Sequence, residues 1–119
     1  MNLRHAAAGN NADWCAAVLA ACGIASARSG ALWAALGPPP LYPGLVTLRE
    51  GCQVAVEAAL AGPVPPDAIK DSFADLDLTA QGFDCAIKGA WLLAPKAVPV
   101  ANPALPVADD AGFARWNRG

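Results

Sequence analysis

Apolar residues recur at helical spacing in the first organised segment of the chain, NNADWCAAVLAACG. Asn10 or Asn11 can cap this helix, and Gly23 can end it in a left-handed conformation. The apolar positions follow steps of three, four and seven residues, and they are Trp14, Cys15, Val18, Leu19 and Cys22. The pattern predicts an amphipathic helix between residues 10 and 23.

Two weaker patterns follow this helix. SARSGALWAALG predicts a second helix, capped by Ser26 or Ser29 and ended by Gly37. The next segment, PPPLYP, cannot be helical because proline lacks the amide donor. It predicts a rigid extended loop in which Leu41 and Tyr42 plug the core. A ligand for a proline-reading domain is the alternative interpretation of this loop.

The middle and the end of the chain show strand patterns. GLVTLRE and AIKDSF each predict a strand, and CQVAVEAALAG between them predicts a helix of about ten residues. Such a helix can join parallel strands or cover an antiparallel sheet. The clearest predicted strand starts at Phe83, where apolar and polar positions alternate. Its apolar face is Phe83, Cys85, Ile87, Gly89, Trp91 and Leu93.

These elements predict two parts of the chain. Residues 1–94 are expected to form an α+β domain, a small sheet of three or more strands with helices packed on one face. Residues 95–119 are expected to form a Pro-rich arm and a short helical tail, because prolines stand at positions 95, 99, 103 and 106. The tail would carry Phe113 and Trp116 on one side.

Composition narrows the function. The 119 residues carry a formal charge of −2, with the charges scattered, which argues against nucleic acid and anionic membranes as partners. Neither a signal peptide nor an apolar run of about 18 residues stands out, so we predict a cytoplasmic protein with reduced thiols. With 15% charged and 55% hydrophobic residues, some surface is expected to lie against another chain.

The candidate chemistry is sparse. The four cysteines have no paired spacing and His5 is the only histidine, so we predict no metal site, no cofactor and no catalytic residue. The acidic stretch IKDSFADLDL lacks the glycine and the final glutamate of a calcium loop and is interpreted as a solvated strand end. If a small-ligand site exists, we expect it where PPPLYP meets KDSF. Its predicted residues are Tyr42, Asp71, Ser72, Phe73 and Trp91.

Several short segments carry a resemblance. NNADWCAAV, PPLYPGLVTL, KDSFADLDLTAQGF and AWLLAP resemble, in order and spacing, the amino-terminal accessory region of bacterial GNAT-family acetyltransferase-like proteins. In that family the region precedes a linker and an acetyltransferase-like domain that opens with a helix similar to VADDAGFARW. The family holds acetyl-CoA pyrophosphate on a loop of the type R/Q-x-x-G-x-G/A. This loop does not occur here, so the resemblance implies no catalytic residue for this chain.

Together these patterns predict a non-enzymatic, self-associating interaction module or small-ligand-binding module. The expected assembly is a C2 homodimer with exchanged arms, joined through Phe113 and Trp116. One alternative is a degenerate or half-sized acyltransferase that completes a CoA site across a dimer. The other is a remnant fragment without a selected function.

Overall fold

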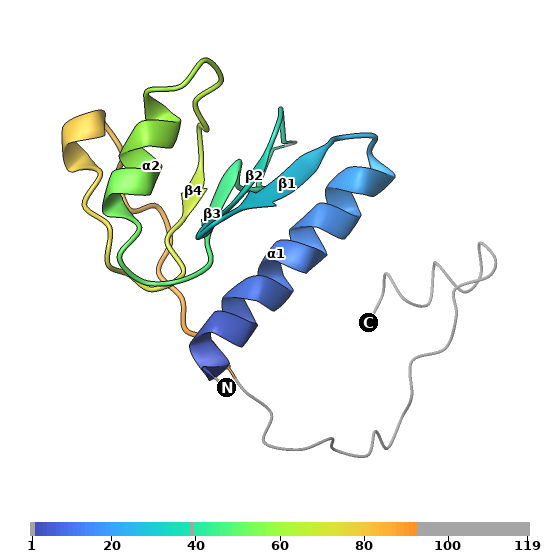
Figure 1. The fold of residues 1–119 in the computed structure, drawn as a ribbon, viewed down its shortest axis with the longest axis horizontal. Helices are drawn as coiled ribbons and strands as arrows, with labels where there is room; N and C mark the ends of the chain where they lie inside the picture. Colours follow the sequence, from blue (N-terminus) through green and yellow to red (C-terminus); the bar gives the residue numbers. More distant parts are fainter. Residues whose placement is uncertain (1, 39, 93–119) are drawn as a thin grey trace, which may run out of the picture.

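The computed structural model describes residues 2–38 and 40–92. The predicted arm and tail, the boundary at residue 94, and Phe113 and Trp116 lie outside the described residues. Within them the chain has α+β architecture with a small sheet, which confirms the predicted fold class. Figure 1 shows the long helix α1 along one side of the sheet and the shorter helix α2 on the other side.

Two α-helices, four short strands and one 3-10 turn make up the described part of the chain. In order they are α1 (Leu3–Ala21), β1 (Ser26–Ser29), β2 (Leu32–Ala35), β3 (Leu45–Thr47), α2 (Gln53–Leu60), β4 (Ile69–Lys70) and η1 (Thr79–Gln81). The sheet order is β1-β2-β3-β4. The first three strands pair antiparallel, and β3 pairs parallel with β4. Helix α2 is therefore the crossover of a parallel β3–α2–β4 unit.

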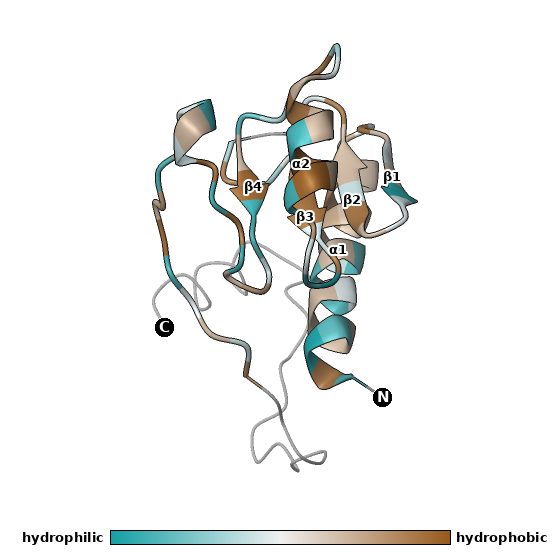
Figure 2. Ribbon diagram, turned by 60° about the vertical axis from the view of Figure 1, so that its left-hand side comes forward, coloured by the Kyte–Doolittle hydropathy of each residue, from teal (hydrophilic) through white to brown (hydrophobic). Residues whose placement is uncertain are grey.

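The sheet separates two apolar clusters. Val46 packs with Trp33 and with Cys15 of α1, whereas its neighbour Leu45 packs with Val56 of α2. Adjacent strand residues point to opposite faces, so the two helices cover opposite faces of the sheet. The expectation of helices on a single face is therefore corrected. In Figure 2 the brown of hydrophobic residues covers much of β3 and part of β4 and of α2.

Helix α1 begins earlier than predicted and buries a narrower face. Its cap is Asn2, whose side chain accepts hydrogen bonds from the amides of Arg4 and His5 at 3.0 and 3.2 Å. The buried residues are Ala8, Ala12, Cys15 and Leu19. Alanines at this spacing let the helix lie close to the sheet. Trp14, 65% exposed, and the exposed Cys22 lie off the buried face, contrary to the prediction. Gly23, with φ of +74°, ends the helix region as expected.

The predicted second helix is instead a β-hairpin. Strands β1 and β2 pair from Ser26 with Ala35 to Ser29 with Leu32. Gly30 has φ of +59° in the two-residue turn, a conformation that favours a hairpin. Trp33 is 1% exposed and packs with the α1 cluster. Burial of this side chain outweighs the helical preference of the alanines around it.

The predicted strand from Phe83 does not form within residues 83–92. These residues have no strand pairing, and Cys85 and Ile87 are exposed. The alternating pattern alone is insufficient, because a strand needs a neighbouring edge to satisfy its amides. Helix α2 matches its prediction. Strands β3 and β4 are shorter than predicted, and β4 contains only Ile69 and Lys70.

Only one of the two side chains of the PPPLYP loop that were expected to pack in the core does so. Tyr42 packs against the cluster that contains Trp33 and Val46. Leu41 is fully exposed and has φ of 75°, so its predicted role as a core plug is wrong. Among residues 2–38 and 40–92, no helix combines the length and the apolar composition that a membrane crossing requires.

Candidate functional site

The structure divides the five residues of the predicted ligand site. Ser72 and Trp91 meet, because the Trp91 indole donates a hydrogen bond to the Ser72 carbonyl at 2.8 Å. Asp71 and Phe73 flank Ser72 in the chain, and Phe73 is buried beneath the start of α1. Tyr42 packs in the separate α1-side cluster. None of the five residues lines either of the two hollows described below.

Asp71 organises the backbone of the acidic stretch. Its carboxylate accepts hydrogen bonds from the amides of Phe73, Asp75 and Leu76 at 3.4, 3.3 and 3.0 Å. Asp75 accepts a hydrogen bond from the Gly51 amide at 2.8 Å. These carboxylates hold turns together, as aspartate commonly does in loops. Within the described ranges no group of three or more His, Cys, Asp or Glu side chains is placed to hold a metal ion.

Ser72 and Lys70 are also engaged by the fold. The Ser72 amide donates a hydrogen bond to the buried Thr47 hydroxyl at 2.9 Å, which fixes the chain as it leaves β4. The Lys70 ammonium lies 4.7 Å from the centre of the Trp91 ring, a cation–π contact. This contact and the Trp91 hydrogen bond to Ser72 anchor residue 91 beside β4.

A charged cluster joins the start of α1 to the loop between β3 and α2. The His5 Nε2 atom lies 2.5 Å from a Glu50 oxygen, and the Arg4 guanidinium lies 3.8 Å from the other. The His5 ring packs edge-on against Phe73, with 5.5 Å between the ring centres. The hydrogen bond from His5, followed by a backbone hydrogen bond, lowers the pKa of the Glu50 carboxyl below its ordinary 4.5.

The Glu50 contact predicts a small acid-sensitive contribution to stability. Because the folded pKa lies below the unfolded value, ionised Glu50 stabilises the fold above about pH 4.5, and this stabilisation is lost as the pH falls through the folded pKa. Urea unfolding of wild type and Glu50→Gln should therefore differ most near pH 6 and converge near pH 3. His5→Gln, which removes the main cause of the shift, should show the same convergence. A constant difference across this range would contradict the assignment.

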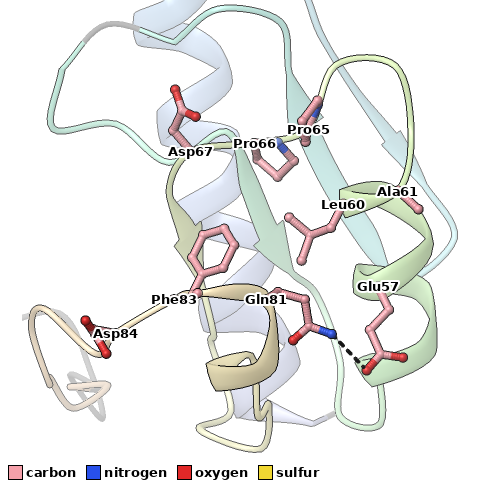
Figure 3. A pocket seen from close by; sticks show the side chains of 10 residues that line it. Glu57, Leu60, Ala61, Pro65, Pro66, Asp67, Gln81, Phe83 and Asp84 are labelled. Carbon is pink, nitrogen blue, oxygen red and sulfur yellow. Dashed lines mark hydrogen bonds between the residues drawn. The ribbon is translucent and has the colours of Figure 1, made fainter.

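A hollow with a volume of about 750 Å³, here called the α2–η1 pocket, lies beside helix α2. It lies between the end of α2, the following loop and the chain after η1 (Figure 3). Its lining residues are Glu57, Leu60, Ala61, Pro65, Pro66, Asp67, Gln81, Gly82, Phe83 and Asp84. In Figure 3, Leu60, Pro66 and Phe83 face the gap between these segments.

Two glycines position the walls of this pocket. Gly82 has φ of +84° and turns the chain from η1 to Phe83. Gly44 lies where a Cβ atom would come within 3.0 Å of the Pro66 Cβ, so glycine allows the start of β3 and the pocket loop to approach. The Gly44 amide also donates to the Ala68 carbonyl at 2.9 Å. Gly82 is therefore required for its backbone conformation, and Gly44 is required because a side chain would not fit beside Pro66.

The pocket is acidic and has no basic lining residue. Glu57, Asp67 and Asp84 carry its three carboxylates. One Glu57 oxygen accepts hydrogen bonds from the Gln53 and Gln81 amides, at 2.8 and 3.5 Å. Asp67 and Asp84 are exposed at the rim, where Figure 3 shows them outside the apolar gap. Among the described residues, none of the three forms a salt bridge. Leu60, Pro66 and Phe83 beside an anionic rim suit an organic cation that carries an apolar group.

A shallower hollow of about 510 Å³ lies beside α1, and its charged side chains already have partners. Arg28 lines it and donates hydrogen bonds to the Asp13 carboxylate at 2.5 Å and to the Gly9 carbonyl at 2.9 Å. His5, also in its lining, contacts Glu50. The α2–η1 pocket is therefore the better candidate site. Sequence reasoning missed it, and the only local signals were the PVPPD segment and the glycine after TAQ.

Searches of protein-family models, curated proteins and solved structures found no match to this chain. The resemblance to the accessory region of GNAT-family proteins stays a prediction.

Proposed function

We propose that this chain is a non-enzymatic binding module whose α2–η1 pocket receives an organic cation with an apolar body. The observation that carries the proposal is the combination of three apolar side chains, Leu60, Pro66 and Phe83, with three carboxylates and no basic lining residue. A volume of about 750 Å³ falls in the range of ordinary small-ligand pockets.

The two kinds of lining group would contribute differently. Contact with Leu60, Pro66 and Phe83 would bury the apolar body of the ligand. Each exposed charge pair at the rim would add about 0–1 kcal/mol. The carboxylates would select ligands of positive charge.

The state of the two buried thiols and of the histidine supports a non-enzymatic role. Burial raises the pKa of the Cys15 and Cys52 thiols, which disfavours the reactive thiolate. The single histidine, His5, is held by Glu50 and Phe73. Among residues 2–38 and 40–92, no contact favours the alternative of a half-sized acyltransferase. Self-association through the arm belongs to the proposal, and a cytoplasmic location remains a prediction.

A matched set of ligands tests the pocket. We expect 2-phenylethylamine to shift the NMR signals of Leu60 and Phe83 and to bind several-fold more tightly than neutral 2-phenylethanol, with phenylacetate weakest, because the rim is anionic. Asp67→Asn should reduce the preference for the amine. Asp13→Asn, the same charge change outside the pocket, should leave it unchanged.

A steric variant provides the second control. Ala61 is exposed and lines the pocket, so Ala61→Trp should fill the gap and abolish the shifts. Ala58→Trp, on the exposed surface of the same helix and outside the pocket, should preserve them. If millimolar concentrations of all three ligands leave the Leu60 and Phe83 signals unchanged both in wild type and in Trp116→Ala, the pocket is not a binding site and the proposal fails.

A further inference from the structure

We infer that the occupant of the α2–η1 pocket is the tail of a second copy of this chain, residues 113–118. The inference rests on the proposed function, since it names the partner of the same pocket. It commits to a reciprocal dimer in which each tail enters the pocket of the other copy.

The composition of the tail is complementary to the pocket. Residues 113–118 read FARWNR, in which Phe113 and Trp116 supply apolar groups and Arg115 and Arg118 supply cations. No aspartate or glutamate occurs from residue 111 to residue 119. An aromatic ring would fill the gap beside Leu60, and the guanidinium groups would reach the carboxylates at the rim. Buried aromatic anchors and arginines are the residues that most often dominate binding energy.

The course of the chain favours the tail of a second copy, rather than the chain's own tail, as the occupant of the pocket. From Phe83 the described chain runs away from the pocket toward the start of α1 (Figure 1). The following segment has prolines at 95, 99, 103 and 106, and its sequence favours an extended, semi-rigid path. At about 3.1 Å per residue, residues 93–106 would extend roughly 40 Å. Because the described chain ends near the start of α1, away from its own pocket (Figure 1), we expect the residues that follow to reach a neighbouring molecule more readily.

Reciprocal exchange gives a closed assembly. Each copy would contribute one pocket and one tail, so two identical contacts form around a two-fold axis and no further copies are recruited. The two contacts form together, because the first one raises the effective concentration of the second pair. The mass of the full chain in solution should therefore be twice the 12.0 kDa of one copy.

Light scattering on the full chain at tens of micromolar tests the pocket side of the contact. We expect wild type at twice the mass of one chain. Ala61→Trp should shift the dimer toward single chains, whereas Ala58→Trp should remain dimeric. Trp116→Ala should weaken association at least about 30-fold, the loss typical of a buried aromatic anchor.

Exchanging the charges of the tail and the pocket rim tests the contribution of the tail to the contact. This test compares two variants, so it does not depend on one variant folding well. Arg115→Glu with Arg118→Glu should weaken the dimer about tenfold, because two rim attractions become repulsions. Adding Asp67→Lys and Asp84→Lys to the same chain should restore dimerisation. Arg49→Glu, an exposed change outside the pocket, should have little effect.

Two outcomes overturn the inference. One is a wild type of single-chain mass at tens of micromolar. The other is a wild-type dimer that neither Ala61→Trp nor the arginine reversals weaken, which would place the interface elsewhere. The ligand titration separates these results from failure of the proposed function, because a pocket that binds 2-phenylethylamine while the tail variants have no effect would refute only the partner.

Discussion

Replacing Trp33 by alanine should lower the free energy of unfolding by about 3–5 kcal/mol. Trp33 is 1% exposed and is among the largest fully buried side chains of the described structure. It lies on β2 and packs with Cys15 and Leu19 of α1 and with Val46 of β3. Its removal would leave a cavity at the junction of the helix and the sheet, which short strands cannot easily close.

Trp14 provides the matched control, because it is the same residue type on α1 but 65% exposed. Urea unfolding of Trp33→Ala and Trp14→Ala should give a large loss for the first and a change within about 0.5 kcal/mol for the second. Equal losses would mean that Trp14 is buried, as the sequence pattern predicts, and would contradict the fold.

Replacing Thr47 by valine should lower the free energy of unfolding by about 1–3 kcal/mol. Thr47 is fully buried, and its hydroxyl accepts the hydrogen bond of the Ser72 amide at 2.9 Å. Valine has nearly the same shape but cannot accept this bond. The buried amide of Ser72 would then lack a partner, and such a group carries its full desolvation cost.

Thr79→Val is the control for this change. The Thr79 hydroxyl donates to the Asp77 carboxylate at 2.7 Å, but both residues are exposed and water can replace the bond. Chemical denaturation should show a loss of less than about 0.5 kcal/mol for Thr79→Val. If Thr47→Val were equally mild, the link between β3 and the chain after β4 would be absent in solution.

The elements that local pattern specifies were predictable. Helix α2 has regular apolar spacing and a Gly62–Pro63 stop, and it occurs where the sequence indicates. The α+β class also follows from the mixture of periodicities. The cap of α1 was not recovered, because Asn10 and Asn11 are equally good caps in isolation and lie inside the helix that Asn2 begins.

The errors arise where distant contacts decide the structure. SARSGALWAALG has caps and alanines that suit a helix, yet Trp33 is buried between the sheet and α1, which only a strand permits here. The segment after Phe83 alternates well but is not paired with any described strand. Neither fact is visible from spacing, because both depend on residues far along the chain.

The candidate site shows the same limit. Asp71 and Ser72 are candidate ligand-binding residues in the sequence, but in the structure the Asp71 carboxylate and the Ser72 backbone amide hold the turn after β4. The α2–η1 pocket instead joins Leu60 and Pro66 to Phe83, residues from two segments without a shared motif. Only the fold brings them together.

The central claim is that the α2–η1 pocket holds the tail of a second copy. The most direct test is an isotope-filtered NMR experiment on a dimer mixed from labelled and unlabelled chains, which detects contacts between copies alone. We predict contacts from the rings of Phe113 or Trp116 in one copy to Leu60 and Phe83 in the other. Contacts between copies that involve the exposed Trp14 and exclude Leu60 and Phe83 would contradict the account.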